Sequence, residues 1–252
     1  MKKSILLCGL LLAATASLAS AAAGVSLRWS ACATDGGALN RNFACNSNNG
    51  SNQLVGTFEL GADLANVSGN EIIVDLASAS PTLPAWWQYR NAGTCRQSSM
   101  TFNTVLAATA INCFDWASGG ATGGIGAYNV GNPSPNTARM IAASAVPVSG
   151  LAGLGPQTEY FSFNLLFNNA KTVGTGLCDG CTVPVCVVFN SINITTPIAA
   201  NNRKLFGPAN GTDSNFATWQ GGLGVGSPRG QGCPAATPTR STTWGSVKSL
   251  YR

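Results

Sequence analysis

Apolar and polar residues alternate at every second position through much of this chain. The clearest example is 160–168, where large apolar side chains have one parity and Ser162 and Asn164 have the other. Because successive side chains of a β-strand point to opposite faces, we expect a strand with one buried face here. The same alternation predicts strands at 25–31, 54–60 and 71–76, and a weaker form of it predicts strands at 100–105, 113–116 and 139–145.

The stretch 185–194 changes parity part-way along. Its apolar residues occupy odd positions up to Phe189 and even positions from Ile192 onward. A regular strand would place one of these groups in water, whereas a β-bulge near Asn190 and Ser191 would turn both groups toward the core. We therefore expect a single bulged strand.

Seven or eight short strands, separated by turns rich in Gly, Asn and Pro and without long helical periodicity, predict a mainly β fold. The expected architecture is one two-sheet β-sandwich, and immunoglobulin-like and jelly-roll-like topologies both remain open. Two glycine- and proline-rich stretches, 118–137 and about 207–252, are expected to be long loops. The chain contains no internal repeat and no second composition regime, so residues 24–252 are expected to form one domain.

Residues 1–23 have the pattern of a secretory signal peptide. Lys2 and Lys3 precede an apolar stretch at 5–12, and small residues follow, including Ala19-Ser20-Ala21. The apolar stretch is too short for a comfortable membrane span. The sequence therefore predicts a secreted protein of bacterial type, extracellular or periplasmic, with no integral membrane segment after cleavage.

Loss of the signal peptide removes Cys8 and leaves an even number of cysteines. An even number in an exported chain predicts a complete set of disulfides. By proximity along the chain we pair Cys32 with Cys45 and Cys95 with Cys113. The last four allow three pairings, of which Cys178–Cys186 with Cys181–Cys233 is preferred. The cysteines concerned are Cys32, Cys45, Cys95, Cys113, Cys178, Cys181, Cys186 and Cys233.

Two local motifs suggest chemistry without establishing it. Cys178 and Cys181 have the spacing of a redox CxxC motif, but that motif normally opens a helix, and here it lies between strands beside a third cysteine, which favours structural disulfides. Oxygen-rich stretches at 46–52 and 210–215 could hold a structural calcium ion. Neither matches an EF-hand and each has at most one carboxylate, so ordinary Asx-type turns are favoured and no cofactor is expected.

Composition excludes several classes of function. Charged residues make up 9% of the chain, against roughly 25% in an average domain. Lys and Arg do not cluster, so nucleic acid is not an expected partner. Low charge also removes a barrier to self-association. The chain has no histidine, which excludes Ser-His-Asp and Cys-His catalysis and His-ligated zinc.

No pair of acidic residues is singled out for glycoside hydrolysis. A glycosidase needs two carboxylates on either side of one bond. Glu71 and Asp75 share a strand face but lie about 13 Å apart at ~3.3 Å per residue, which is too far for that chemistry. An enzyme is therefore not supported by spacing.

Trp86, Trp87 and Tyr89 form the candidate binding site. If this segment is extended, the two tryptophans must point to opposite faces. One would anchor the core, and the other, with Tyr89, would form an exposed or loop-gated surface for a glycan or a protein partner. The alternative is that a loop such as 118–137 covers the rings, in keeping with the usual burial of tryptophan.

The leading functional hypothesis is a secreted, non-catalytic extracellular or cell-surface module for binding, adhesion or surface assembly. The alternative is a secreted carbohydrate-active enzyme or carbohydrate-binding domain. A cleft with paired carboxylates would favour the enzyme, and a flat surface without such a cleft would favour binding.

Overall fold

The computed structural model describes residues 23–209 and 213–222. Within these ranges the chain consists of fourteen β-strands and three short 3-10 helices. The expected signal peptide and most of the expected loop at 207–252 lie outside the described residues. The described part of that stretch is not a loop throughout, because Phe216–Trp219 form a strand. None of the helices in the described part has the length and apolar character needed to span a bilayer.

The smaller of the two main sheets has five strands. Four of them form an antiparallel sheet, and the short β7 adds parallel to β11. In spatial order they are β1 (Gly24–Trp29), β3 (Ser51–Glu59), β11 (Tyr160–Asn168) and β6 (Met100–Asn103), with β7 (Phe114–Asp115) beside β11.

The larger sheet has seven strands, and a separate two-stranded sheet joins β4 and β10. The order of the larger sheet is β2 (Asn40–Arg41), β14 (Phe216–Trp219), β12 (Val185–Thr195), β5 (Gly69–Ser78), β9 (Thr137–Ala145) and β8 (Thr122–Val130), with β13 (Arg203–Phe206) also paired to β12. The remaining elements are β4 (Leu64–Val67), β10 (Ala152–Leu154) and the 3-10 helices η1 (Ala85–Trp87), η2 (Val148–Gly150) and η3 (Ala199–Asn201).

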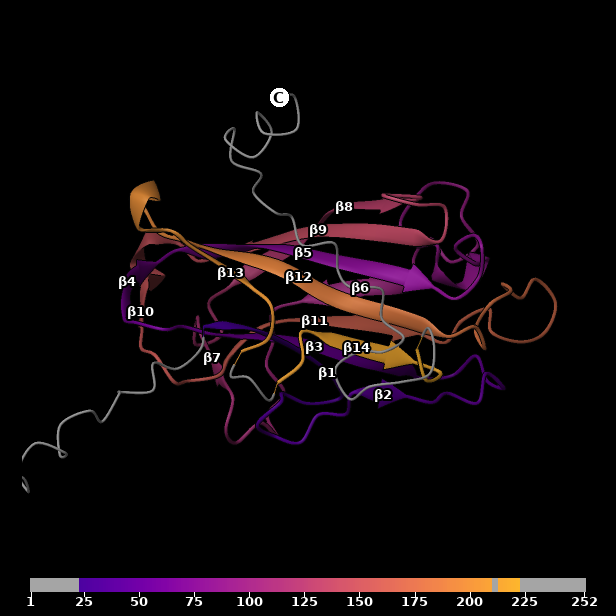
Figure 1. Cartoon of the computed structure of the whole chain (residues 1–252), viewed down its shortest axis with the longest axis horizontal. Helices are drawn as coiled ribbons and strands as arrows, with labels where there is room; N and C mark the ends of the chain where they lie inside the picture. Colours follow the sequence, from indigo (N-terminus) through magenta and orange to yellow (C-terminus); the bar gives the residue numbers. More distant parts are fainter. Residues whose placement is uncertain (1–22, 210–212, 223–252) are drawn as a thin grey trace, which may run out of the picture.

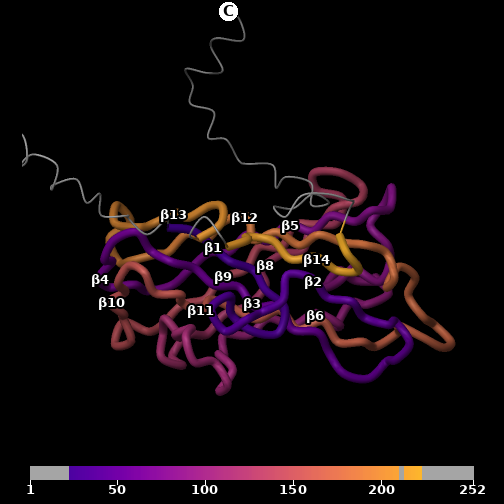
Figure 2. The backbone as a smooth tube through the Cα atoms, turned by 60° about the horizontal axis from the view of Figure 1, so that its bottom comes forward, coloured from indigo at the N-terminus to yellow at the C-terminus, as the bar shows by residue number. Residues whose placement is uncertain are grey.

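The two sheets pack face to face, as the sequence predicts. The long strands of both run along the longest axis of the molecule (Figure 1). In Figure 2, β5 and β12 lie above β3, β11 and β6. The core fills the space between them, and Phe163 of β11 meets Phe189 of β12 edge to face at 5.1 Å between ring centroids. Gly56 lies beneath the Phe163 ring, where a Cβ would come within 2.3 Å of it.

The strongest strand predictions are confirmed. β11 spans the predicted 160–168, and β1, β3 and β5 cover most of the other three well-patterned stretches. The predicted bulge is present, because the register of β12 against β5 shifts between Phe189 and Ser191. Phe189, Ile192 and Ile194 are all fully buried. The bulge therefore returns both apolar sets to the core.

Two further expectations about local structure are wrong. The glycine-rich stretch 118–137 is not a loop throughout, since residues 122–130 form β8 and pair with β9. Phe161 does not share a face with Phe163, because a register shift lies between them. Phe161 packs instead with Val55 in a small cluster apart from the main core. In both places cross-strand pairing overrides the local pattern.

Candidate binding surface

The aromatic segment is neither extended nor exposed, which corrects the sequence-based site. Residues 85–87 form η1 directly after Pro84. Trp86, Trp87 and Tyr89 are all 0% exposed. A helical turn lets adjacent side chains enter the same core, so the divergence expected of a strand does not occur. The exposed or loop-gated aromatic surface predicted from the sequence is therefore not present.

These rings belong to a structural cluster at one end of the sandwich. Trp219 of β14 contacts both Trp86 and Trp87, with centroids 5.1 and 5.4 Å away. The Arg96 guanidinium lies 3.5 Å from the centre of the Trp86 ring and donates a hydrogen bond to the Trp86 carbonyl. Burial lowers the pKa of Arg96 and raises that of Tyr89. The cluster is closed, so we assign it to stability.

Two disulfides lie beside this aromatic cluster and a third lies in the small cluster around Phe161, and all three differ from the predicted pairs. Cys45 is bonded to Cys181, Cys95 to Cys178, and Cys32 to Cys113. The pairing by chain proximity was wrong because loops distant in sequence meet in space: Cys45 and Cys181 are 136 residues apart. The two cysteines of the CxxC motif have different partners, which excludes a bond between them.

Cys186 is also disulfide-bonded. Its partner is none of the other described cysteines, since all six of these pair with one another. The predicted Cys178–Cys186 and Cys181–Cys233 bonds are therefore both wrong. Cys233 itself lies outside the described residues.

The candidate metal sites have structural explanations. The side-chain oxygen of Asn48 accepts hydrogen bonds from the backbone amides of Thr172 and Val173, so in the stretch 46–52 it ties two loops together. Part of the stretch 210–215 lies outside the described residues. A cluster of Cys32, Cys113 and Glu159 has metal-like spacing, but its two sulfur atoms form a disulfide, and Glu159 accepts four hydrogen bonds from neighbouring residues.

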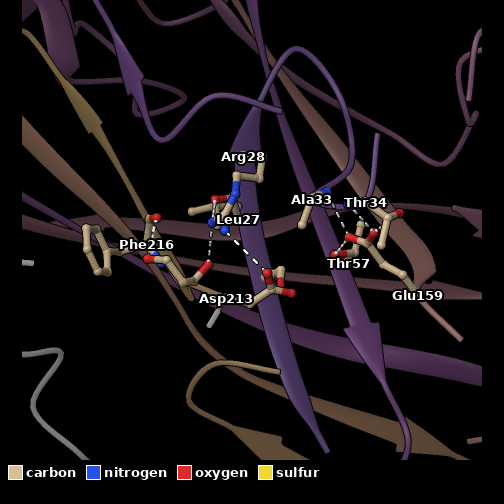
Figure 3. Close-up of polar contacts among 10 residues, drawn as sticks. Leu27, Arg28, Ala33, Thr34, Thr57, Glu159, Asp213 and Phe216 are labelled. Carbon is tan, nitrogen blue, oxygen red and sulfur yellow. Dashed lines mark hydrogen bonds and ion pairs between the residues drawn. The ribbon is translucent and has the colours of Figure 1, made fainter. Parts of the chain in front are cut away.

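The outer face of the smaller sheet is covered along much of β1 and β3. Side chains that leave it there include Thr57 at 1% and Arg28 at 7% exposure. The Glu159 carboxylate lies beneath the segment that carries Ala33 and Thr34 and accepts hydrogen bonds from both backbone amides at 2.9 and 2.8 Å (Figure 3).

Arg28 closes the edge of the covered face. Its guanidinium bonds the carbonyls of Leu27 and Ser214 at 3.1 and 3.0 Å, and it lies 3.5 Å from Asp213 (Figure 3). Burial lowers the pKa of Arg28, while Asp213 and Glu159 counteract that effect. Arg28 and Glu159 are thus engaged with the protein itself.

The outer face of the larger sheet is open by contrast. Side chains of odd-numbered residues in β5 and β9 point outward, and Ile141 is 42% exposed. The strand register places Ile141 beside Ile73, and Ile73 beside Ser191. These side chains form the central row of the face. On the β8 side, Ala127 lies in register with Ile141, and the register shifts between Ile125 and Ala127, so only small residues border the central row there.

Two charged rows flank the central row. In the first, the register sets Ala143, Glu71, Asn193 and Lys204 side by side, and Asn193 donates a hydrogen bond to Glu71 at 2.9 Å. In the second, Arg139 makes two hydrogen bonds to Asp75 at 2.7 and 2.9 Å. Hydrogen bonding to Asp75 raises the pKa of Arg139.

The central row and the first charged row enclose a shallow groove of about 450 Å³. Glycine and alanine residues of β8 and β9 and isoleucine residues of β5 and β9 line it, together with Glu71 and Lys204. The groove is the larger of the two described here, and it crosses strands rather than entering the core. We define the outer-face surface as Glu71, Ile73, Ile141, Asn193 and Lys204.

Sequence reasoning missed this surface. Its residues lie on four strands, and only the cross-strand register brings them together. The available signal was that Ile73 and Ile141 are apolar residues at polar positions of the alternation. Comparison with known proteins adds no further guide, because no family model, curated protein or solved structure matches this chain.

Proposed function

We propose that this protein is a secreted, non-catalytic module that assembles with further copies of itself outside the cell through the outer-face surface. The observation that carries the proposal is the exposed Ile141 beside the half-buried Ile73, between two charged rows on the outer face of the larger sheet. Contiguous apolar surface with a polar rim is typical of protein interaction sites. The disulfides fit an oxidising compartment, in agreement with the predicted signal peptide.

The distribution of charged side chains on this face favours a second copy of the chain as the partner. Each flanking row carries both signs, with Glu71 and Lys204 in one and Asp75 and Arg139 in the other. A face of balanced charge can meet its own copy without net repulsion, whereas a face of one sign cannot. The low charge of the whole chain, 9%, acts in the same direction.

The carboxylates of this face do not support catalysis. Asp75 is engaged by Arg139 and also accepts a hydrogen bond from Asn190 at 2.5 Å, and Glu71 is held by Asn193. Glu71 and Asp75 are four positions apart along the strand, about 13 Å at ~3.3 Å per residue, which is beyond the spacing used by either class of glycosidase.

Carbohydrate binding without catalysis is the second candidate. Phe206 is 48% exposed and lies in register with Ser191 at the end of the central row. Lys204 is 5.3 Å from the centre of its ring. A half-exposed aromatic ring beside polar groups could stack on a sugar.

Sedimentation of the full mature chain over a wide range of concentration tests the proposal. The wild type should associate, and Ile141→Lys should weaken association by roughly tenfold or more, because the interface would bury an unpaired charge. Ile111→Lys is the matched control, since Ile111 is 80% exposed and lies on the loop that covers the opposite face.

Two outcomes would contradict self-assembly. One is a wild type that stays monomeric up to its solubility limit, and the other is equal weakening by both substitutions. A glycan array run in parallel decides the second candidate. Glycan binding that is lost in Phe206→Ala while the wild type stays monomeric would support a carbohydrate-binding module instead.

A further inference from the structure

A second, more enclosed cavity lies on the outer face of the smaller sheet, away from the outer-face surface. Its volume is about 240 Å³, and the loop 104–112 forms one of its walls. Val55 and Asn164 supply the sheet side, and Leu106 and Ala110 supply the loop side. A cavity of this size suits a molecule of only a few heavy atoms, since drug-sized ligands occupy about 300–1,000 Å³.

The loop that forms the wall is fixed at both ends. Near one end, the side-chain amide of Asn164 donates a hydrogen bond to the Val105 carbonyl at 2.8 Å. At the other end, the Cys32–Cys113 disulfide and Asp35 hold the chain, and Asp35 Oδ1 accepts a hydrogen bond from the Asn112 amide at 2.9 Å. The cavity is therefore preformed, and a ligand would not have to order the loop.

Two acceptor groups on the wall keep unused capacity. Asn164 donates both of its amide hydrogens, and its amide oxygen already accepts from Gln53 Nε2 at 2.9 Å. Gln53 Oε1, in contrast, accepts no hydrogen bond from another described residue. Asp35 Oδ2 receives only a 3.2 Å contact from the Ile111 amide.

The charge and polarity of the other lining residues indicate which class of ligand fits the cavity. Asp35 is the one ionisable side chain among the residues that line the cavity, and no Lys or Arg is among them. Val55, Leu106 and Ala110 give it an apolar side. The wall thus offers acceptors and negative charge at one side and aliphatic contact at the other, so it lacks a group that would hold an anion.

We propose that this cavity binds a primary ammonium group on a short aliphatic chain, with Asp35 and Gln53 accepting its hydrogen bonds and Leu106 and Ala110 packing against the chain. An ammonium has three donors and no acceptor, which complements this wall. Charge-assisted hydrogen bonds of this kind are the strong ones. The group could belong to a free amine or to a lysine side chain of another protein.

The test compares pentylamine with 1-pentanol, which has the same chain length but no charge, by titration of the full mature protein followed by NMR. Pentylamine should bind roughly tenfold or more tightly than pentanol. Asp35→Asn keeps an oxygen for the Asn112 amide and should abolish that preference. Asp63→Asn removes the same charge from an exposed site elsewhere and should keep it.

Ala110→Trp provides an independent check, because it fills the cavity without changing any charged group, and it should abolish binding of both probes. Near-ultraviolet circular dichroism and the melting temperature verify that each variant is folded. Nα-acetyl-lysine methylamide distinguishes the two sources: tighter binding than pentylamine indicates a lysine of a partner, and weaker binding indicates a free amine. Equal affinity for pentylamine and pentanol, or unchanged pentylamine binding in Ala110→Trp, overturns the proposal.

Discussion

The two outer faces of the sandwich treat outward-pointing side chains in opposite ways: one face buries them and the other leaves them exposed. On the smaller sheet, Thr57 points away from the core but is 1% exposed, because Glu159 and the segment around Ala33 cover it. On the larger sheet, Ile141 also points away from the core and is 42% exposed. A polar side chain is thus buried on one face while an apolar one is left in water on the other.

This difference separates residues that stabilise the fold from residues that are available for association. The covered face uses a disulfide, a buried carboxylate and a buried guanidinium, which are costly to place unless each is fully partnered. On the open face the Asp75 carboxylate and the Arg139 guanidinium pair with each other and keep 18% and 24% of their side-chain surface exposed. We infer that substitutions on the covered face should alter folding, and those on the open face should alter association.

The largest effect is expected from the disulfide of the covered face. Cys32→Ala combined with Cys113→Ala should lower the free energy of unfolding by about 4–5 kcal/mol in the chain-entropy model, because the bond closes a long loop. Denaturant unfolding of the oxidised protein measures it. A change below about 1 kcal/mol would mean that the cover contributes little, and the contrast between the faces would fail.

The disulfide at Cys186 is expected to contribute comparably to the free energy of unfolding, and its partner can be identified. Cys186 lies on β12, and its partner is none of the other described cysteines. Cys233 is the one cysteine of the predicted mature chain that remains, so non-reducing peptide mapping should recover a peptide pair linking Cys186 and Cys233. Recovery of a different partner would contradict the prediction, as would stoichiometric alkylation without reductant.

The next largest loss of stability is expected from removing the buried Glu159 carboxylate of the covered face. Glu159→Ala removes the acceptor for the backbone amides of Ala33 and Thr34 and for the Thr57 hydroxyl. A buried donor left unpaired costs about 1–3 kcal/mol. Of the three donors only Thr57 is fully buried, so we expect the free energy of unfolding to fall by about 3 kcal/mol. Glu71→Ala is the matched control on the open face and should cost less than about 0.5 kcal/mol. Equal losses would show that exposure does not distinguish the two faces.

The sequence predicts the sandwich well because alternation reports directly on which side chains face a core. The bulge in β12 was predictable for the same reason, since Phe189 and Ile192 have opposite parity and both are apolar. Alternation does not report what covers the outer side of a strand. Arg28 and Thr57 have the pattern of solvent-exposed residues, yet they are buried under segments distant in the sequence.

The candidate sites were less predictable because they depend on tertiary proximity. Pairing Cys45 with Cys181 requires loops that no local rule brings together. An extended segment would make Trp86 and Trp87 diverge, whereas the chain forms a 3-10 helix directly after Pro84. The outer-face surface depends on register across four strands, and register is fixed by the assembled sheet.

The smallest expected effect on folding is at the centre of the open face. Ile141→Lys should change the free energy of unfolding by less than about 0.5 kcal/mol, because the side chain is already 42% exposed and a lysine can extend into water. Ile111→Lys, on the opposite side, should be equally mild. The two substitutions should then differ only in sedimentation, where Ile141→Lys weakens association and Ile111→Lys does not. If Ile141→Lys lowers stability by more than about 1 kcal/mol in the monomer, Ile141 serves packing within the sheet, and its exposure no longer argues for an interface.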